Sequence, residues 1–286
     1  MLFFLLYWYN VPMRKLYKYF LLLLFTFLFC GNICCVQAAS DSDSVGRLVT
    51  KGGITRYRYP DGQFASDTWI TIENKQYYFS ETGTMVTGWQ KIKKNWYYFK
   101  SNGVLKTNMK HSQHILVKSS GSYAKIYMLS RKKNGKWKQI LATNGRVGRN
   151  GAGKTREGMG KTPTGTFTMG RVFGIRSNPG CKLPYTQIRS EHYWVDDPSS
   201  RYYNKFVNST KVTPDWSSAE HLIDYSGAYD YAVAINYNSR CIPGKGSAIF
   251  LHCMTNGPTA GCVSVPRSAM IKILKKLHAD AKITIY

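Results

Sequence analysis

Acidic residues are scarce in this 286-residue chain, which holds 15 Asp and Glu against 40 Lys and Arg and carries a formal net charge of +25 at pH 7. The excess is not held in a tail, because residues 53–110 hold 9 basic against 4 acidic residues and residues 111–286 hold 26 against 9. A surface of this kind favours polyanionic partners. No RNA- or DNA-binding motif accompanies the charge, so we expect no nucleic-acid partner.

Cysteine is sparse as well once the first forty residues are set aside. The remaining thiols are Cys181, Cys241, Cys253 and Cys262, too few to staple a chain of this length. Their spacing, with or without histidine, matches no common zinc-ligand pattern. We therefore expect at most one disulfide, no metal site and no cofactor.

No apolar run reaches the roughly 20 residues that a membrane-spanning helix needs. The longest run, residues 19–30, is broken by Gly31, follows a basic cluster at 14–18, and precedes the small residue Ala38. This three-part order predicts a secretory signal peptide over residues 1–38. The protein is therefore expected to be exported and to meet the membrane only before cleavage.

The polar segment that follows predicts a linker, and a repeat module and a larger domain come after it. Met13, just before the basic cluster, is an alternative start to Met1. The four expected parts, in order, are the signal peptide, the linker, the repeat module and the larger domain: 1–38, 39–52, 53–110 and 111–286.

An aromatic pattern recurs at a spacing of 20 residues in the repeat module. The recurring pairs are Trp69 and Trp89, the triplets at 77–79 and 97–99, and Gly83 and Gly103. Tyr59, Asp61 and Gly62 look like the remnant of an earlier copy. Such self-similarity indicates a stacked array. Each unit is expected to be one β-hairpin, in which the aromatic strand comes first and a glycine turn leads to a second short strand.

The stretch Thr87 to Phe99 resembles the cell-wall-binding repeats of Gram-positive surface proteins, which are related to choline-binding repeats. The resemblance implies aromatic cages that hold a quaternary ammonium by cation–π attraction. Trp89, Trp96 and Tyr98 would line such a cage. The implied partners are choline, teichoic acid or another anionic wall polymer. The alternative is that these rings only pack one hairpin on the next.

The larger domain reads as mainly β. Alternating apolar runs predict its strands, which are 115–117, 124–129, 165–169, 231–235, 248–252 and 283–286. One amphipathic helix is expected from Pro266 to Leu277, with proline in its first turn. His111, His114 and His278 are expected at the surface.

Cys262 and His252 form the strongest chemical pattern of the chain. His252 closes one apolar run and Cys262 opens another after a short turn, so adjacent strand ends would bring imidazole and thiol together. A nearby imidazole activates a cysteine nucleophile. The dipole of the helix that follows would help to hold a thiolate if the start of that helix pointed at the sulfur. The amides around Gly261 and Cys262 are expected to bind an oxyanion. Cys253 is expected to face away from His252.

Two blocks, Lys161 to Phe167 and His252 to Val265, resemble the L,D-transpeptidases that remodel peptidoglycan. The resemblance covers residues 112–286 and extends to Trp194–Asn204 and Glu220–Leu222. It implies a mixed β-sheet catalytic domain with a C-terminal helix, after the hairpin repeats, in a protein of a Gram-positive-type cell wall.

The resemblance also implies a reaction. Cys262 would attack the carbonyl of the third residue of a stem tetrapeptide and release D-alanine, and the thioester would pass to the amine of a second stem as a 3→3 cross-link. His252 would be the base, oriented by a backbone carbonyl around Cys253. The alternatives are an L,D-carboxypeptidase acting on the same stems and a wall-anchored protein without activity. Sortase-like and papain-like enzymes fit the order and spacing of the two residues less well.

The chain departs from the commonest pattern of that family at two positions. Ala260 stands where a second histidine is usual, and Ser264 stands where an arginine is usual, so neither can make those contacts. Thr259, His221 and Trp194 are the expected substrate-binding residues. Trp194 belongs to a long aromatic insertion at 171–215, which would form a wall or lid.

Overall fold

The computed structural model describes residues 45–286, so the predicted signal peptide lies outside the described residues. The described residues form two compact units. One comprises 45–68 and 79–84, and the other comprises 69–78 and 85–286. The last repeat hairpin therefore belongs to the same compact unit as the larger domain. Within residues 45–286, no helix has both the length and the hydrophobicity required to cross a bilayer.

Three successive β-hairpins are present, which confirms one hairpin per repeat, but the first begins at Arg47 within the segment predicted to be a linker. Their strands are β1 (Arg47–Lys51) with β2 (Ile54–Arg58), β3 (Thr68–Ile72) with β4 (Lys75–Phe79), and β5 (Gly88–Ile92) with β6 (Asn95–Phe99). The aromatic strand is the second strand of its hairpin, not the first as expected. The turn before β4 uses Glu73 and Asn74, both at positive φ, which suits the tight turn of a two-residue hairpin. The segment after each glycine contributes isolated bridges such as Phe99↔Leu105.

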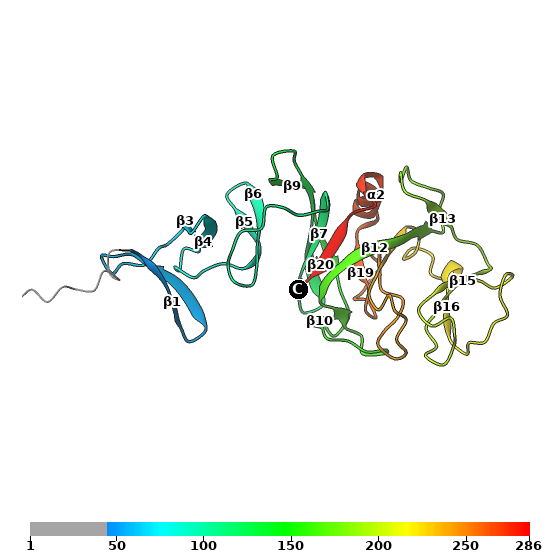
Figure 1. The fold of residues 1–286 in the computed structure, drawn as a ribbon. Coiled ribbons are helices and arrows are strands. Elements are labelled where there is room, and N and C mark those ends of the chain that lie inside the picture. Colours follow the sequence, from blue (N-terminus) through cyan, green and yellow to red (C-terminus); the bar gives the residue numbers. More distant parts are fainter. Residues whose placement is uncertain (1–44) are drawn as a thin grey trace, which may run out of the picture. The chain divides into compact units, whose positions relative to one another are not determined.

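The larger domain is built on one mixed sheet that closes on itself. Strands follow the order β19-β18-β17-β12-β20-β7-β8-β9, and β19 also pairs with β9. In Figure 1 the C-terminal strand β20 lies between β7 and β12, as its pairings require. The eight strands are β7 (Gln113–Ser120), β8 (Tyr123–Arg131), β9 (Trp137–Arg146), β12 (Gly165–Gly174), β17 (Ala232–Ile235), β18 (Phe250–Cys253), β19 (Val263–Val265) and β20 (Lys282–Ile285).

Short elements decorate this sheet. The insertion after β12 and the segment that follows it supply β13 (Tyr185–Gln187), β14 (His192–Val195), β15 (Phe206–Asn208), β16 (Ala219–His221) and a 3₁₀ turn (Leu222–Asp224). The expected helix is confirmed as α2 (Arg267–Lys276), and β10 (Ala152–Gly153) pairs with β11 (Thr162–Pro163). The aromatic insertion contributes β14 and β15 to a separate three-stranded sheet of order β15-β14-β16, and its role as a wall or lid stays a prediction.

Alternating residues of the closed sheet divide between two apolar clusters. The main core takes Ile126, Leu251 and Val263 together with α2 residues such as Met270 and Ile273. A second cluster on the other face of β18 holds Phe250, Cys262, Tyr229 and Phe173 with Leu222. Successive side chains of a strand point to opposite faces of the sheet, and this alternation decides which side chains lie on the face of the site.

A third cluster packs the last repeat hairpin on β8 and β9. Trp89 and Trp96 lie buried with Trp137, Leu116 and Leu129. His111 and His114, which we expected at the surface, are also buried here, and the ring of His114 lies 4.6 Å from that of Trp89. The large apolar area that these rings bury explains why β5 and β6 belong to the same compact unit as the larger domain.

Candidate active site

Two neighbouring parallel strands position the predicted dyad. β18 carries His252 and β19 begins one residue after Cys262, with Leu251 opposite Val263 and His252 opposite Ser264. Both side chains project from the face away from the main core. With strands about 4.8 Å apart and about 3.3 Å per residue, the two Cα atoms are separated by about 8 Å. That spacing allows an imidazole and a thiol on one face to meet.

The imidazole of His252 is held by the backbone. Its Nδ1 donates to the carbonyl of Cys253 at 2.8 Å, as the resemblance implied, and this bond leaves Nε2 as the proton acceptor. Burial lowers the pKa of His252 to about 4, against the opposing effect of the carbonyls of Cys253 and Ala228. The ring is therefore neutral at pH 7 and free to take a proton.

The thiol of Cys262 is buried and protonated in the resting protein. Sγ donates to the carbonyl of Ala248 at 3.1 Å and accepts from the amide of Phe250 at 3.2 Å. Burial, followed by the charge of Glu220, raises the pKa of this thiol far above its usual range. The resting pair is therefore neutral, with the proton on the sulfur of Cys262 and none on Nε2 of His252.

The expected helix begins at Arg267, and β19 lies between it and Cys262. The buried face of α2 belongs to the main core, whereas Cys262 belongs to the second cluster. The condition for a dipole effect on the thiolate, a helix start that points at the sulfur, is therefore not met. The expectation for Cys253 is confirmed, since its thiol packs in the main core and donates to the carbonyl of Tyr231 at 3.6 Å.

Two threonine hydroxyls hold the loop that carries Cys262. The fully buried Thr162 donates to the Cys262 carbonyl at 3.1 Å and accepts from the amide of Gly148 at 2.8 Å. Thr259 donates to the same carbonyl at 2.6 Å and accepts from the amide of Gly261 at 3.2 Å. The two blocks that carry the family resemblance are thus bonded to each other. Oxyanion binding by Gly261 and substrate binding by Thr259 stay predictions.

The other two expected substrate residues use their polar atoms within the protein. His221 is bonded to Asp224 at 2.9 Å and to the carbonyl of Ser190 at 2.6 Å. Trp194 donates its indole N–H to Asn204 at 3.0 Å, and its ring lies 4.8 Å from Phe250. Their roles in substrate binding stay predictions.

The expected wall-ligand residues are closed in by other rings. Trp89 lies 5.3 Å from Tyr98 and 5.2 Å from Trp137, and Trp96 lies 5.1 Å from Tyr127. A second aromatic group between hairpins is more open, since Trp69 keeps partial exposure and lies 5.0 Å from the half-buried Tyr97.

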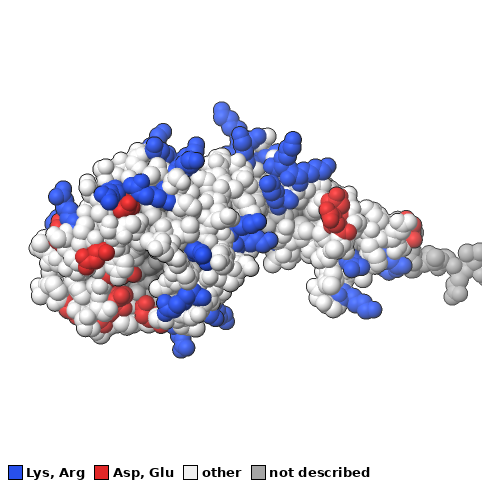
Figure 2. All heavy atoms as spheres, turned by 180° about the vertical axis from the view of Figure 1, so that it is seen from behind, with Lys and Arg blue, Asp and Glu red and all other residues white. Residues whose placement is uncertain are grey.

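A small cavity of about 160 Å³ reaches Cys262. Small residues form its floor, including Gly246, Ala248, Ala260 and Gly261. Sequence reasoning missed the charged residues of its walls, which are Arg149, Arg156 and Lys161 together with Glu157, Asp196 and Glu220. The walls therefore combine carboxylate-binding and amine-binding groups beside the thiol. Over the wider surface, Lys and Arg are spread across the visible face and carboxylates form a few patches (Figure 2).

Glu220 and Tyr229 connect this cavity with the dyad. The Tyr229 hydroxyl donates to Glu220 Oε2 at 2.6 Å, and its ring lies 5.4 Å from that of His252. Burial raises the pKa of Glu220 to about 7, with the Tyr229 bond opposing it. The sequence alone could have indicated Glu220 as a site residue. His221 and Glu220 are neighbours on one strand and must face opposite sides, so only one of them can face the thiol.

Comparison with known proteins identifies both parts of the chain. Residues 112–285 match the L,D-transpeptidase catalytic domain, and residues 65–109 match the choline-binding repeat. No curated protein matches.

Among solved structures, a choline-binding domain from Streptococcus pneumoniae is 25% identical over 22% of this chain and 94% of its own, with a TM-score of 0.21. The pneumococcal cell-wall endolysin of phage Cp-1, complexed with choline, is 19% identical over 34% of this chain and 25% of its own, with a TM-score of 0.22. The autolysin LytC from Streptococcus pneumoniae is 17% identical over 34% of this chain and 19% of its own, with a TM-score of 0.22.

This chain covers only about a quarter of the endolysin's length. The match to the L,D-transpeptidase catalytic domain, in contrast, spans more than half of the chain. The chain belongs to the L,D-transpeptidase catalytic-domain family, and a choline-binding repeat precedes that domain.

Proposed function

We propose that the protein is an exported peptidoglycan L,D-transpeptidase that works through a thioester on Cys262. The observation that supports this most directly is the pairing of β18 with β19, which places Cys262 and a neutral, backbone-oriented His252 on one face. Family membership makes acyl transfer the reaction class, and the dyad supplies a nucleophile and a base for it.

The first half-reaction consumes the tetrapeptide donor. Cys262 Sγ attacks the carbonyl carbon of the third stem residue while its proton passes to Nε2 of His252. Imidazolium and thiolate form together, so their mutual attraction offsets part of the desolvation that opposes each charge alone. The tetrahedral intermediate then collapses, the peptide C–N bond breaks, and His252 returns the proton to the departing D-alanine amine.

The cavity at Cys262 suits the leaving end of such a donor. Its volume of about 160 Å³ is below the ~300–1,000 Å³ typical of sites for whole ligands, so it holds a small terminal residue. Arg149 and Lys161 line it and would bind the terminal carboxylate. Glu157 is already engaged, because it accepts from Tyr203 at 2.6 Å and from Ser247 at 2.8 Å.

The second half-reaction decides between two products. The side-chain amine of a second stem attacks the thioester carbonyl, the C–S bond breaks, and a proton passes through His252 back to sulfur, which gives a 3→3 cross-link. Water in place of the amine makes the enzyme an L,D-carboxypeptidase. The intact dyad argues against a binding protein without activity.

The repeats are proposed to keep the enzyme at the wall by binding choline, teichoic acid or another anionic polymer. Trp89, Trp96 and Tyr98 remain candidates for a quaternary-ammonium cage. The partly exposed Trp69 and Tyr97 are added to them, because their rings meet between successive hairpins at 5.0 Å.

The test uses the full chain with tetrapeptide stems and mass spectrometry. We expect D-alanine release and a covalent adduct on Cys262 with a carbapenem, and neither with Cys262→Ala. His252→Gln should acylate at least ~100-fold more slowly, the lower end of general-base contributions. A wild-type chain that forms no adduct and releases no D-alanine would overturn the proposal.

A further inference from the structure

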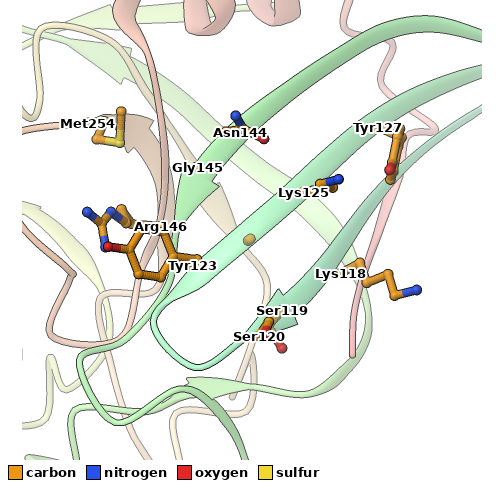
Figure 3. Close-up of a pocket in the computed structure, with 11 residues that line it drawn as sticks. Lys118, Ser119, Ser120, Tyr123, Lys125, Tyr127, Asn144, Gly145, Arg146 and Met254 are labelled. Atoms are coloured by element: carbon orange, nitrogen blue, oxygen red, sulfur yellow. The ribbon is translucent and has the colours of Figure 1, made fainter.

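An open cavity of about 730 Å³ is lined mainly by residues of β7, β8 and β9 (Figure 3), and Cys262 does not line it. Two cross-strand rows line it. Lys118 is opposite Lys125 and Lys125 is opposite Asn144, while the adjacent row places Tyr123 opposite Arg146. Alternation puts Tyr123, Lys125 and Tyr127 on this face and buries Ala124 and Ile126 in the main core.

The cavity is lined by cationic side chains that have no anionic partner among the described residues. Lys118, Lys125 and Arg146 line it, and no Asp or Glu side chain does; the backbone oxygen of Tyr286 accepts from the lining residue Ser119 at 2.8 Å. Over residues 45–286 none of these three side chains forms an ion pair or donates a hydrogen bond to the protein. The Arg146 guanidinium lies 3.7 Å from the ring centroid of Tyr123, whose side chain is mostly exposed. Three unpaired cations beside exposed rings suit an anionic ligand with an apolar or sugar body.

One row of paired residues connects the cavity with the dyad. His252 is opposite Ser264, Ser264 is opposite Arg146, and Arg146 is opposite Tyr123. Paired residues project from the same face, so Arg146 lies two strand spacings, about 10 Å, from His252. Ser264 Oγ, between them, is the one buried side-chain polar atom of the described residues without a hydrogen-bond partner.

The two cavities lie at opposite ends of β18. Ala248 and Ile249, just before that strand, line the cavity at Cys262, whereas Met254, just after it, lines the cationic cavity. No residue lines both. A ligand in one cavity therefore leaves the other free, and His252 stands between them.

We propose that this cationic cavity is the acceptor site, which binds the carboxylate-bearing stem peptide whose amine takes the acyl group. The inference rests on the proposed function. The donor enters at Cys262 and loses D-alanine there, while the acceptor lies along β8 and presents its amine past Met254 and Arg146. The amine nitrogen attacks the thioester carbonyl, the C–S bond breaks, and the amine proton passes through His252 to the sulfur. No further reactant is needed.

The test reverses two charges in the full chain with Lys118→Glu and Lys125→Glu. The matched control reverses two exposed lysines of the β8–β9 turn, Lys133→Glu and Lys136→Glu, which line neither cavity. With a tetrapeptide donor, cross-linked dimer is measured against acceptor concentration, and acylation without acceptor reports whether the dyad is intact. We expect at least a tenfold rise in acceptor KM for the cavity variant and less than a twofold change for the control.

A binding measurement separates the acceptor site from the chemistry. Calorimetry of soluble acceptor stem with the Cys262→Ala chain should show binding that the added charge reversal weakens at least tenfold, even if the wild type proves unable to acylate. Equal acceptor KM and equal binding in the cavity and control variants would overturn the acceptor site. It would also be overturned if a polyphosphodiester bound this cavity and the stem peptide did not.

Discussion

The Glu220 carboxyl should make the folded protein less stable as the pH rises from about 5 to about 8. Burial raises its pKa from the usual 4.5 to about 7. A raised carboxyl pKa means that the folded state holds the proton more tightly than the unfolded state. The protonated Glu220 carboxyl therefore makes its full contribution to the free energy of unfolding below about pH 4.5, and this contribution is lost as the pH rises through about 7. The difference corresponds to about 3 kcal/mol of unfolding free energy.

Glu220→Gln removes the charge and keeps an acceptor for the Tyr229 hydroxyl, which now donates to Glu220 at 2.6 Å. In urea unfolding of the full chain, the wild type should lose about 2.5 kcal/mol more than the variant between pH 5 and pH 8. Glu81→Gln, at an exposed carboxylate, is the control and should follow the wild type. If the Glu220 variant also follows the wild type, the carboxyl is not held in a desolvated site and the reasoning fails.

The same substitution should also change the thiol. After burial, the charge of Glu220 is the next cause of the raised pKa of Cys262. Glu220→Gln should therefore lower the pKa of that thiol and speed its alkylation by iodoacetamide at pH 8–9. Slower or unchanged alkylation would show that the carboxylate does not act on the sulfur.

Four further substitutions test the scaffold and the repeats. Thr162→Val removes the hydroxyl that bonds the Cys262 carbonyl and should cost about 1–3 kcal/mol in urea unfolding, with slower acylation; wild-type values for both would contradict the anchoring role. Gly145→Ala places a Cβ against the Ser264 carbonyl and the Ile126 side chain, so we expect a large loss of soluble folded protein, and normal yield and melting would refute the close approach of β9 and β19. Trp89→Ala should lower the free energy of unfolding by about 3–5 kcal/mol. Trp69→Ala should weaken retention on choline resin and change stability less. If Trp89→Ala weakened retention and Trp69→Ala did not, Trp89 would be the ligand-facing ring.

Residues that stand within short segments of recognisable pattern could be predicted from the sequence. Cys262 and His252 stand beside recognisable strand runs, and α2 shows its apolar face in four buried positions. The hairpins follow from a repeat of 20 residues. The order of strands within each hairpin was wrong because the turn at Glu73 and Asn74 carries no glycine, although both residues adopt positive φ.

What depends on distant contacts could not be read from the sequence. β9 is a long strand with exposed and half-buried residues, so its pattern is weak, and its pairing with β19 depends on Gly145 having no side chain. Trp89 and His114 are buried by each other and by Trp137, at positions far apart in the chain. Glu220 was missed because its neighbour His221 offered the more familiar chemistry.

Cys262 is proposed to carry the acyl group after its proton passes to His252. The sharpest test is intact-mass and peptide mass spectrometry of the full chain, quenched in acid after mixing with a tetrapeptide donor. We expect a mass increase equal to the stem minus D-alanine, located on the peptide that contains Cys262 and removed by hydroxylamine. D-alanine release with no adduct on that peptide, or equal release by Cys262→Ala, would contradict it.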